Sequence, residues 1–272
     1  MKYILCILFL WSASLHAQTS AGAPEVETQG KNALINQSRK ITVLDKQEQL
    51  RILYYKPIYF AYGDPTAKLQ FSFRVPLFDQ FGLNFAYSQI IFWELQEESK
   101  PFLDATYNPE IFYRVKYDKP VIRSIDYGAW EHNSNGKAGD ESRSYDQSYI
   151  RANWAFESKS WVIQTSAKAK YIWSVDETNR DVNDYIGPWE LEFKFIQLFD
   201  SIFDQLEAVV NVNPGGKWGT EFDKGGYQLS FNFHLGGLKV VPAFYLQYYH
   251  GYAETLVNYD QSVDEVRAGF MF

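Results

Sequence analysis

Hydrophobic and polar residues alternate along most of the chain. From about Pro57 to Phe272, successive segments place an apolar or aromatic residue at every second position and polar residues between them. Alternation with a period of two indicates β-strands with unlike faces. In the clearest segment the apolar side is Tyr227, Leu229, Phe231, Phe233 and Leu235, and the polar side is Gln228, Ser230, Asn232 and His234.

The pattern repeats often enough to predict about twelve strands, an even number as in single-chain bacterial barrels. A soluble β-sandwich alternates as well, so alternation alone leaves two fold classes open. The polar faces, however, carry Arg, Lys and Glu in mid-strand, and the chain ends on an alternating segment whose last apolar residue is Phe272. Short connections are expected at Asp118-Lys119, 157–160 and Gly236-Gly237, and long ones at 96–108, 133–144 and 176–187.

Short turns at one end, long loops at the other and a polar interior are typical of outer-membrane barrels. We therefore predict an all-β fold, a twelve-stranded antiparallel transmembrane β-barrel in the bacterial outer membrane. A secreted soluble β-protein is the alternative. Beyond the first residues the chain has no apolar run near the ~18 residues that a spanning helix needs, which excludes a helical membrane protein.

The N-terminus has the features of a secretory signal peptide. Lys2 is basic, residues 3–13 are mostly apolar, and Leu15-His16-Ala17 is an acceptable cleavage site. A buried first helix is the alternative. We predict a signal peptide over residues 1–17, a polar N-terminal segment over residues 18–48 and the barrel over residues 49–272.

Composition agrees with strands that have unlike faces. The chain of 272 residues is 46% hydrophobic and 18% aromatic, yet its mean hydropathy is −0.34. Its net charge of −7 leaves no basic stripe to neutralise phosphates, so we expect no nucleic-acid partner. The single cysteine, Cys6, falls in the predicted signal peptide, so the exported chain would contain no disulfide.

Candidate chemistry is concentrated in two neighbouring segments, 131–137 and 142–147. His132 and Ser134 are two residues apart, so in an extended strand they would share a face about 6.5 to 7 Å apart, where an imidazole can activate a hydroxyl. Asp146, on the returning strand, could orient the imidazole and stabilise its charged form. The alternative is a polar extracellular loop with an incidental histidine.

The candidate residues of these two strands lie on the same side of the sheet only if one of the strands is irregular. Asp146 shares the apolar, lipid-side face of its strand, and His132 and Ser134 should match it. Upstream, however, residues 125, 127 and 129 form an apolar set of the opposite parity. Glycine within a strand often marks a bulge, so we predict a one-residue bulge near Gly128.

The two segments resemble the signature of the outer-membrane phospholipase A family, which is His-x-Ser-Asn-Gly-Arg/Lys followed by Ser-Arg-Ser-aromatic-Asn. Here they read His132-Asn133-Ser134-Asn135-Gly136-Lys137 and Ser142-Arg143-Ser144-Tyr145-Asp146. The resemblance covers essentially residues 55–272. Further segments that resemble the family in the same order are 87–89, 93–95, 97–99, 101–102, 108–110 and 251–256.

The resemblance implies a twelve-stranded barrel and a serine hydrolase that removes acyl chains from membrane phospholipids, of A1/A2 and lysophospholipase type. It implies that Ser134 is the nucleophile, that His132 is the general base and that the backbone N–H of Gly136 donates to the oxyanion. Asp146 stands where the family usually has asparagine. This departure places a carboxylate in a nearly apolar setting.

The resemblance also implies a Ca²⁺ cofactor and activation by formation of a homodimer. Calcium would be held by the side chain of Ser142, the backbone carbonyl of Lys137 and a carbonyl of the partner subunit's Ser99. Hard oxygen ligands of this kind suit calcium. Lys137 replaces the more usual arginine, which leaves a carbonyl ligand intact.

Gln89 supports a dimer independently of the resemblance. It continues the apolar series of residues 83, 85, 87 and 91, so its amide would point into lipid. An unsatisfied amide there is costly, and a partner subunit would relieve the cost. A glutamine at the level of the lipid headgroups is the alternative.

A catalytically inactive structural or pore-forming barrel is the alternative function. The histidines offer no further site, because His16, His132, His234 and His250 are scattered without metal-ligand spacing. We expect His234, on a polar face, to point into the lumen.

Overall fold

The computed structural model describes residues 51–272 apart from 79–80, 120, 199–202 and 236–241. The predicted signal peptide, the polar segment 18–48 and the predicted turn at Gly236-Gly237 therefore lie outside the described residues. Within the described part of the chain, no helix has both the length and the apolar character needed to cross a membrane.

Strands make up most of the described chain. They are β1 (Tyr59–Gly63), β2 (Ala67–Phe78), β3 (Leu83–Trp93), β4 (Phe102–Lys116), β5 (Ile122–Ser134), β6 (Ser144–Glu157), β7 (Trp161–Val175), β8 (Trp189–Leu198), β9 (Phe203–Gly215), β10 (Glu221–Leu235), β11 (Ala243–Gly251) and β12 (Val263–Met271). Between them the described residues include the short helices η2 (Gly139–Glu141), η3 (Glu177–Asn179) and α2 (Asn183–Ile186).

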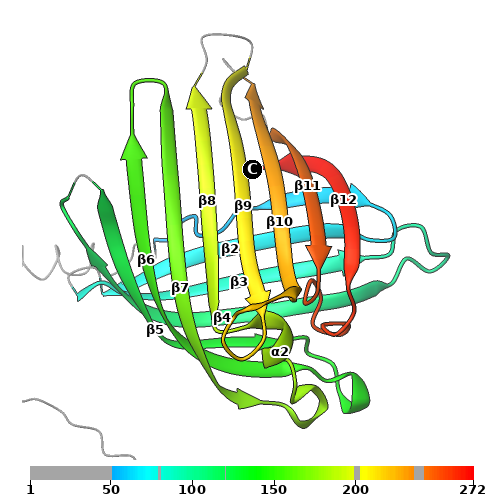
Figure 1. Ribbon diagram of the computed structural model, residues 1–272. Coiled ribbons are helices and arrows are strands. Elements are labelled where there is room, and N and C mark those ends of the chain that lie inside the picture. The colour runs from blue at the N-terminus through cyan, green and yellow to red at the C-terminus, as the bar shows by residue number, and fades with distance from the viewer. Residues whose placement is uncertain (1–50, 79–80, 120, 199–202, 236–241) are drawn as a thin grey trace, which may run out of the picture. The chain divides into compact units, whose positions relative to one another are not determined.

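These strands form a closed antiparallel barrel. Each strand pairs with its neighbours in the chain, and β1 closes the sheet against β12, with Tyr59 opposite Met271. Figure 1 shows the turn that joins β6 to β7 at one end and α2 with the β11–β12 loop at the other. The predicted twelve-stranded antiparallel barrel is confirmed.

The predicted alternation of short and long connections holds with one correction. Short turns join β4 to β5 and β6 to β7, and long loops join β5 to β6 and β7 to β8. The long connection expected over 96–108 is too long, because β4 begins at Phe102. Asn108-Pro109 looks like a turn in the sequence, but Pro109 lies within the strand opposite Tyr87, and Asn108 is buried in the lumen.

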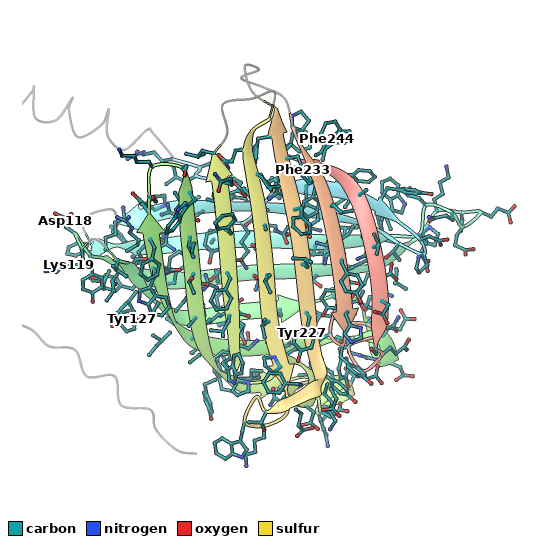
Figure 2. The ribbon with its side chains drawn as sticks, turned by 45° about the horizontal axis from the view of Figure 1, so that its top comes forward. Asp118, Lys119, Tyr127, Tyr227, Phe233 and Phe244 are labelled. Atoms are coloured by element: carbon teal, nitrogen blue, oxygen red, sulfur yellow. The ribbon has the colours of Figure 1, made fainter. Side chains whose placement is uncertain are left out.

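The two faces of each strand separate as the alternation predicts. Ser230 and Asn232 of β10 are buried inside the barrel, and Phe244 of β11 is exposed on the outside. Figure 2 shows Phe233 and Phe244 near one end of these strands and Tyr227 near the other, as in the aromatic girdles of membrane barrels. We call the set of outward-facing side chains the outer wall.

Charged side chains fill much of the lumen. The Lys168 ammonium lies 2.7 Å from the Glu131 carboxylate, and Arg114 makes two hydrogen bonds to Asp126 at 2.6 and 2.7 Å. A polar cavity of about 670 Å³ remains among them. His234 faces this side, as expected, with its Nε2 3.6 Å from Glu207. The ion pairs keep these charged groups partnered inside the barrel.

Loops cover the lumen at the end that carries the long connections. Val182 and Ile186 of the β7–β8 connection pack with Leu256 and Tyr259 of the β11–β12 loop and with the inward-facing Tyr145 of β6. The backbone N–H groups of residues 256 and 257 donate to a carboxylate oxygen of Asp104. The two loops are therefore fixed to each other and to the barrel.

Candidate active site on the outer wall

A β-bulge in β5 brings the candidate residues to the outer wall. Gly128 pairs with Tyr149 of β6 and Glu131 pairs with Gln147, so β5 carries one extra residue between these points. The same extra residue appears against β4. The buried residues of β5 have even numbers up to Gly128. Beyond the bulge they have odd numbers, as Glu131 and Asn133 show. The predicted one-residue bulge near Gly128 is confirmed.

His132 and Asp146 then meet across two adjacent strands. They are register partners in β5 and β6, and His132 Nδ1 lies 2.9 Å from Asp146 Oδ1. Their side chains are 30% and 20% exposed, which is low enough to limit screening by water. Because Nδ1 faces the carboxylate, Nε2 is the ring nitrogen that remains for a hydroxyl.

Ser134 and Gly136 complete the group predicted for acyl transfer. Ser134 is the next outward-facing residue after His132, and within the described residues its hydroxyl makes no hydrogen bond. Gly136 has a φ of 68°, a conformation that favours glycine. Its backbone N–H likewise donates to no group in the described part of the chain. A hydroxyl and a backbone donor, each without a partner in the described chain, therefore follow His132 closely in the sequence.

Asn135 holds the loop that comes after the serine. Its side chain accepts hydrogen bonds from the backbone N–H groups of Lys137 and Arg143 and donates to the carbonyl of Glu141. Asn135 itself is 4% exposed. This buried amide joins both ends of the loop, so Gly136 and Ser142 have fixed positions relative to the strands.

The structure adds a carboxylate beside the predicted calcium ligands. The Ser142 hydroxyl donates to Asp176 Oδ2 at 3.2 Å, and Lys137 turns its ammonium away, to Glu141 at 2.9 Å. Hydrogen bonds from the backbone N–H and the hydroxyl of Thr178, together with that from Ser142, lower the pKa of Asp176. The sequence analysis missed Asp176, because it lies on the distant β7–β8 connection.

Ser99 and Gln89 lie on the neighbouring β3–β4 hairpin. Ser99 is exposed in the connection, and in the described chain it makes no hydrogen bond to Ser142 or Lys137. Gln89 faces the outer wall and accepts from the hydroxyl of Tyr87 at 3.1 Å. Its amide N–H groups find no acceptor within the described residues, so the predicted polar exception on the outer wall is present.

Side chains in the lumen contact the inner face of β5, the strand that carries His132 and Ser134. Asn108 donates from its side-chain amide to the carbonyl of His132 at 2.9 Å, and Lys56 donates to Asn108 at 3.1 Å. Pro109 comes directly after Asn108 and has no N–H of its own to donate. Sequence reasoning also missed this contact, because it assigned Asn108 to the end of a loop.

Comparison with known proteins agrees with the geometry. The family model described as Phospholipase A1 matches residues 37–272. Phospholipase A1 of Proteus vulgaris is 30% identical over 221 residues, which cover 75% of this chain and 68% of the relative. Phospholipase A1 of Escherichia coli (strain K12) is 29% identical over 200 residues, which cover 70% and 61% of the two chains.

Solved structures share the fold. The outer membrane phospholipase A from Escherichia coli superposes with a TM-score of 0.65 at 24% identity, covering 81% of this chain and 94% of that one. The Salmonella typhi outer membrane phospholipase dimer with bound calcium gives 0.66 at 23% identity, with 83% and 92% covered. These findings confirm the predicted family and barrel class. The chain belongs to the phospholipase A1 family, a family of outer-membrane β-barrel enzymes that hydrolyse phospholipid esters.

Proposed function

We propose that this chain hydrolyses acyl esters of phospholipids by a calcium-assisted Ser-His-Asp mechanism and is active as a homodimer in the bacterial outer membrane. One observation carries the proposal. His132 Nδ1 and Asp146 Oδ1 lie 2.9 Å apart across two strands, and Ser134 is the next residue on the same outward face. A hydrolase that faces lipid meets its substrate without extracting it from the membrane.

Each residue has a defined part in the reaction. The Ser134 oxygen bonds to the ester carbonyl carbon while its proton passes to His132 Nε2, and Asp146 stabilises the imidazolium. The ester C–O bond then breaks, and the proton moves to the leaving oxygen, which releases a lysophospholipid. Water attacks the acyl-serine with its proton going to His132, and Ser134 regains a proton as the fatty acid leaves.

Gly136 is suited to stabilise the negative charge that develops on the carbonyl oxygen. Its N–H is not used by the protein, and the φ of 68° together with the hydrogen bonds of Asn135 gives it a fixed direction. A preorganised donor of this kind is typically worth about 3 to 4 kcal/mol in the transition state. A fixed donor incurs no reorganisation cost when the charge forms.

The residues around Ser142 fit a calcium ion. The described residues contain no cluster of three or more His, Cys, Asp or Glu side chains that would hold a metal, so oxygen atoms of other kinds must contribute. Ser142, the carbonyl of Lys137 and the carboxylate of Asp176 supply such hard donors, and the partner subunit's Ser99 would add a carbonyl. Bound calcium would supply positive charge beside the oxyanion.

The pairing of the strands supports a dimer contact at Gln89, close to the candidate nucleophile. Gln89 of β3 lies opposite Tyr107 of β4, and Tyr107 lies opposite Ser134 of β5. Two strand spacings separate Gln89 from Ser134, a distance of about 10 Å. A partner that satisfies the free amide of Gln89 would therefore also approach the nucleophile, which links assembly to activity.

The test is hydrolysis of phospholipid in detergent micelles by the purified dimer, with calcium and after its chelation. We expect activity only with calcium, loss of activity in Ser134→Ala with normal folding, and labelling of Ser134 alone by a sulfonyl fluoride. Ser160→Ala, in the turn at the other end of the barrel, is the matched control and should keep full activity. Hydrolysis by Ser134→Ala equal to that of the native chain would refute the mechanism.

A passive pore has less support. Loops cover one end of the barrel, and ion pairs such as Lys168–Glu131 fill much of the lumen. Conductance measurements in planar bilayers separate the two functions. Steady conductance without phospholipid hydrolysis would favour the pore.

A further inference from the structure

We propose that Trp130 is a positioning residue whose indole N–H holds the Asp146 carboxylate in place for His132. The inference rests on the proposed function and assigns a fourth side chain to the same site. It concerns how this chain accommodates an aspartate on a wall that faces lipid.

The contacts of Asp146 point to this role. Trp130 Nε1 donates to Asp146 Oδ1 at 2.9 Å, the same oxygen and the same distance as His132 Nδ1. The Trp130 ring also lies nearly parallel to the His132 ring, with centroids 6.0 Å apart and an interplanar angle of 22°. The indole therefore touches both members of the pair and fixes each relative to the other.

A carboxylate in this position needs a second donor. The Asp146 side chain is only 20% exposed on a wall built mainly from apolar side chains, and an ionised carboxylate without partners is costly there. His132 alone would neutralise it only when the imidazole is charged. The indole N–H donates in both states of the imidazole, because it does not titrate. Trp130 thus keeps the carboxylate oriented throughout the cycle.

A second set of contacts fixes the bulge that presents Trp130. The hydroxyl of Ser148 donates to the carbonyl of Ala129 at 2.9 Å, and Trp173 Nε1 donates to the Ser148 oxygen at 3.2 Å. Ala129 is the residue at which β5 changes parity. A bulge leaves a ladder carbonyl without its usual partner, and Ser148 supplies a donor from the neighbouring strand. The position of Trp130 is therefore locked from both β5 and β6.

Trp130→Phe keeps the ring and removes the N–H. We expect kcat to fall about tenfold, the loss typical of one charge-assisted hydrogen bond, with KM unchanged within about twofold. Trp154→Phe is the matched control, because Trp154 lies on the same wall of β6 and donates to no group of the described residues. It should keep the native kcat.

A double-mutant cycle separates positioning from structural support. Asp146→Asn removes the charge, so Trp130→Phe should cost less than about threefold when it is added to Asp146→Asn. Equal losses in both backgrounds, or a native kcat in Trp130→Phe, would overturn the inference. The rate of Ser134 labelling by a sulfonyl fluoride gives the same comparison without a lipid substrate. If the native chain neither hydrolyses phospholipid nor is labelled, the proposed function has failed rather than this inference.

Discussion

Two histidine–aspartate pairs cross neighbouring strands on the outer wall of this barrel. In the β5–β6 pair, His132 Nδ1 lies 2.9 Å from Asp146 Oδ1, and in the β11–β12 pair, His250 Nδ1 lies 2.8 Å from Asp264 Oδ1. Both pairs join direct register partners. Each aspartate also accepts a second hydrogen bond, from Trp130 in the first pair and from Tyr248 in the second.

The two pairs differ in the residues that come after the histidine. β5 continues in extended conformation from His132 to Ser134, so the serine shares the outer wall. β11 ends at Gly251, whose φ is 106°, and Tyr252 turns back to donate its N–H to the carbonyl of Gly225. Tyr252 takes the sequence position after His250 that Ser134 takes after His132, and its ring packs against Tyr185 of the β7–β8 connection. An imidazole paired with a carboxylate is therefore present in both places, but a serine on the same face in only one.

Exposure adds a second difference. The side chains of His250 and Asp264 are 53% and 64% exposed, against 30% and 20% for His132 and Asp146. Water screens an exposed ion pair and weakens its effect on the imidazole. A hydrogen-bonded His–Asp pair is therefore not evidence of a site until its surroundings supply a nucleophile, an oxyanion donor and partial burial.

Substitution of the two histidines should give the largest difference in kcat between the pairs. His132→Asn should lower kcat for phospholipid hydrolysis by about 10⁵-fold, because the serine loses its base. His250→Asn should leave kcat within about twofold of the native value. Initial rates in detergent micelles with calcium measure both. Comparable losses in the two variants would show that the β11–β12 pair takes part in the reaction.

Substitution of the two aspartates should give a smaller difference in kcat. Asp146→Ala should lower kcat by about 10³- to 10⁴-fold, since the imidazole loses its orientation. Asp146→Asn keeps an acceptor for His132 and should cost only about tenfold. Asp264→Ala and Asp264→Asn should not change the rate. If Asp146→Asn is as damaging as Asp146→Ala, the negative charge rather than the orientation is the property that the site requires.

Much of this architecture is predictable from the chain alone, because a membrane barrel has a simple period. Alternation predicts the strands, and the change of parity between Ile125 and His132 predicts the bulge that the pairing of Gly128 and Glu131 confirms. The predicted loop over 96–108 was wrong in its second part, because a proline in a strand resembles a turn. Local spacing and the family motif together indicate His132, Ser134 and Asp146.

Contacts across strands are harder to predict. The link from Trp130 to Asp146 depends on the bulge and on the register of β5 with β6, and spacing determines neither the direction of the indole nor its partner. Asp176 reaches Ser142 from another hairpin. His250 seemed isolated in the sequence for the same reason, since its partner Asp264 lies beyond a long loop. Register between distant segments is set by packing of the whole sheet.

The calcium requirement for activity should also distinguish the two pairs, with a smaller effect than the substitutions above. Only the β5–β6 pair is followed by a loop that carries Ser142, whose hydroxyl contacts Asp176 of the β7–β8 connection, and Asp176→Asn should raise the calcium concentration for half-maximal activity about tenfold. Glu177→Gln, next to it and exposed, is the control and should have no effect. An unchanged calcium requirement in Asp176→Asn would remove this carboxylate from the proposed site.

The pKa of Asp176 predicts how the calcium requirement depends on pH. Hydrogen bonds from Thr178 and Ser142 lower the pKa of Asp176, so the group stays ionised as the pH falls into the usual carboxyl range and is protonated only below it. The calcium concentration for half-maximal activity should therefore stay constant between pH 8 and about pH 5. An increase over this interval would indicate that another group with a higher pKa controls binding.

The smallest expected effect concerns support from the lumen. His250 has register partners in both neighbouring strands, Tyr227 and Asp264, whereas the carbonyl of His132 accepts a hydrogen bond from the side-chain amide of Asn108. Asn108→Ala should lower kcat about threefold, because one neutral hydrogen bond is lost behind the imidazole. Asn153→Ala is the control, since Asn153 donates to Ser124 and Asp126 farther along the same strand. If the control lowers kcat equally, the lumen network stabilises β5 as a whole. A loss confined to Asn108→Ala would show that His132, unlike His250, is held in place from inside the barrel.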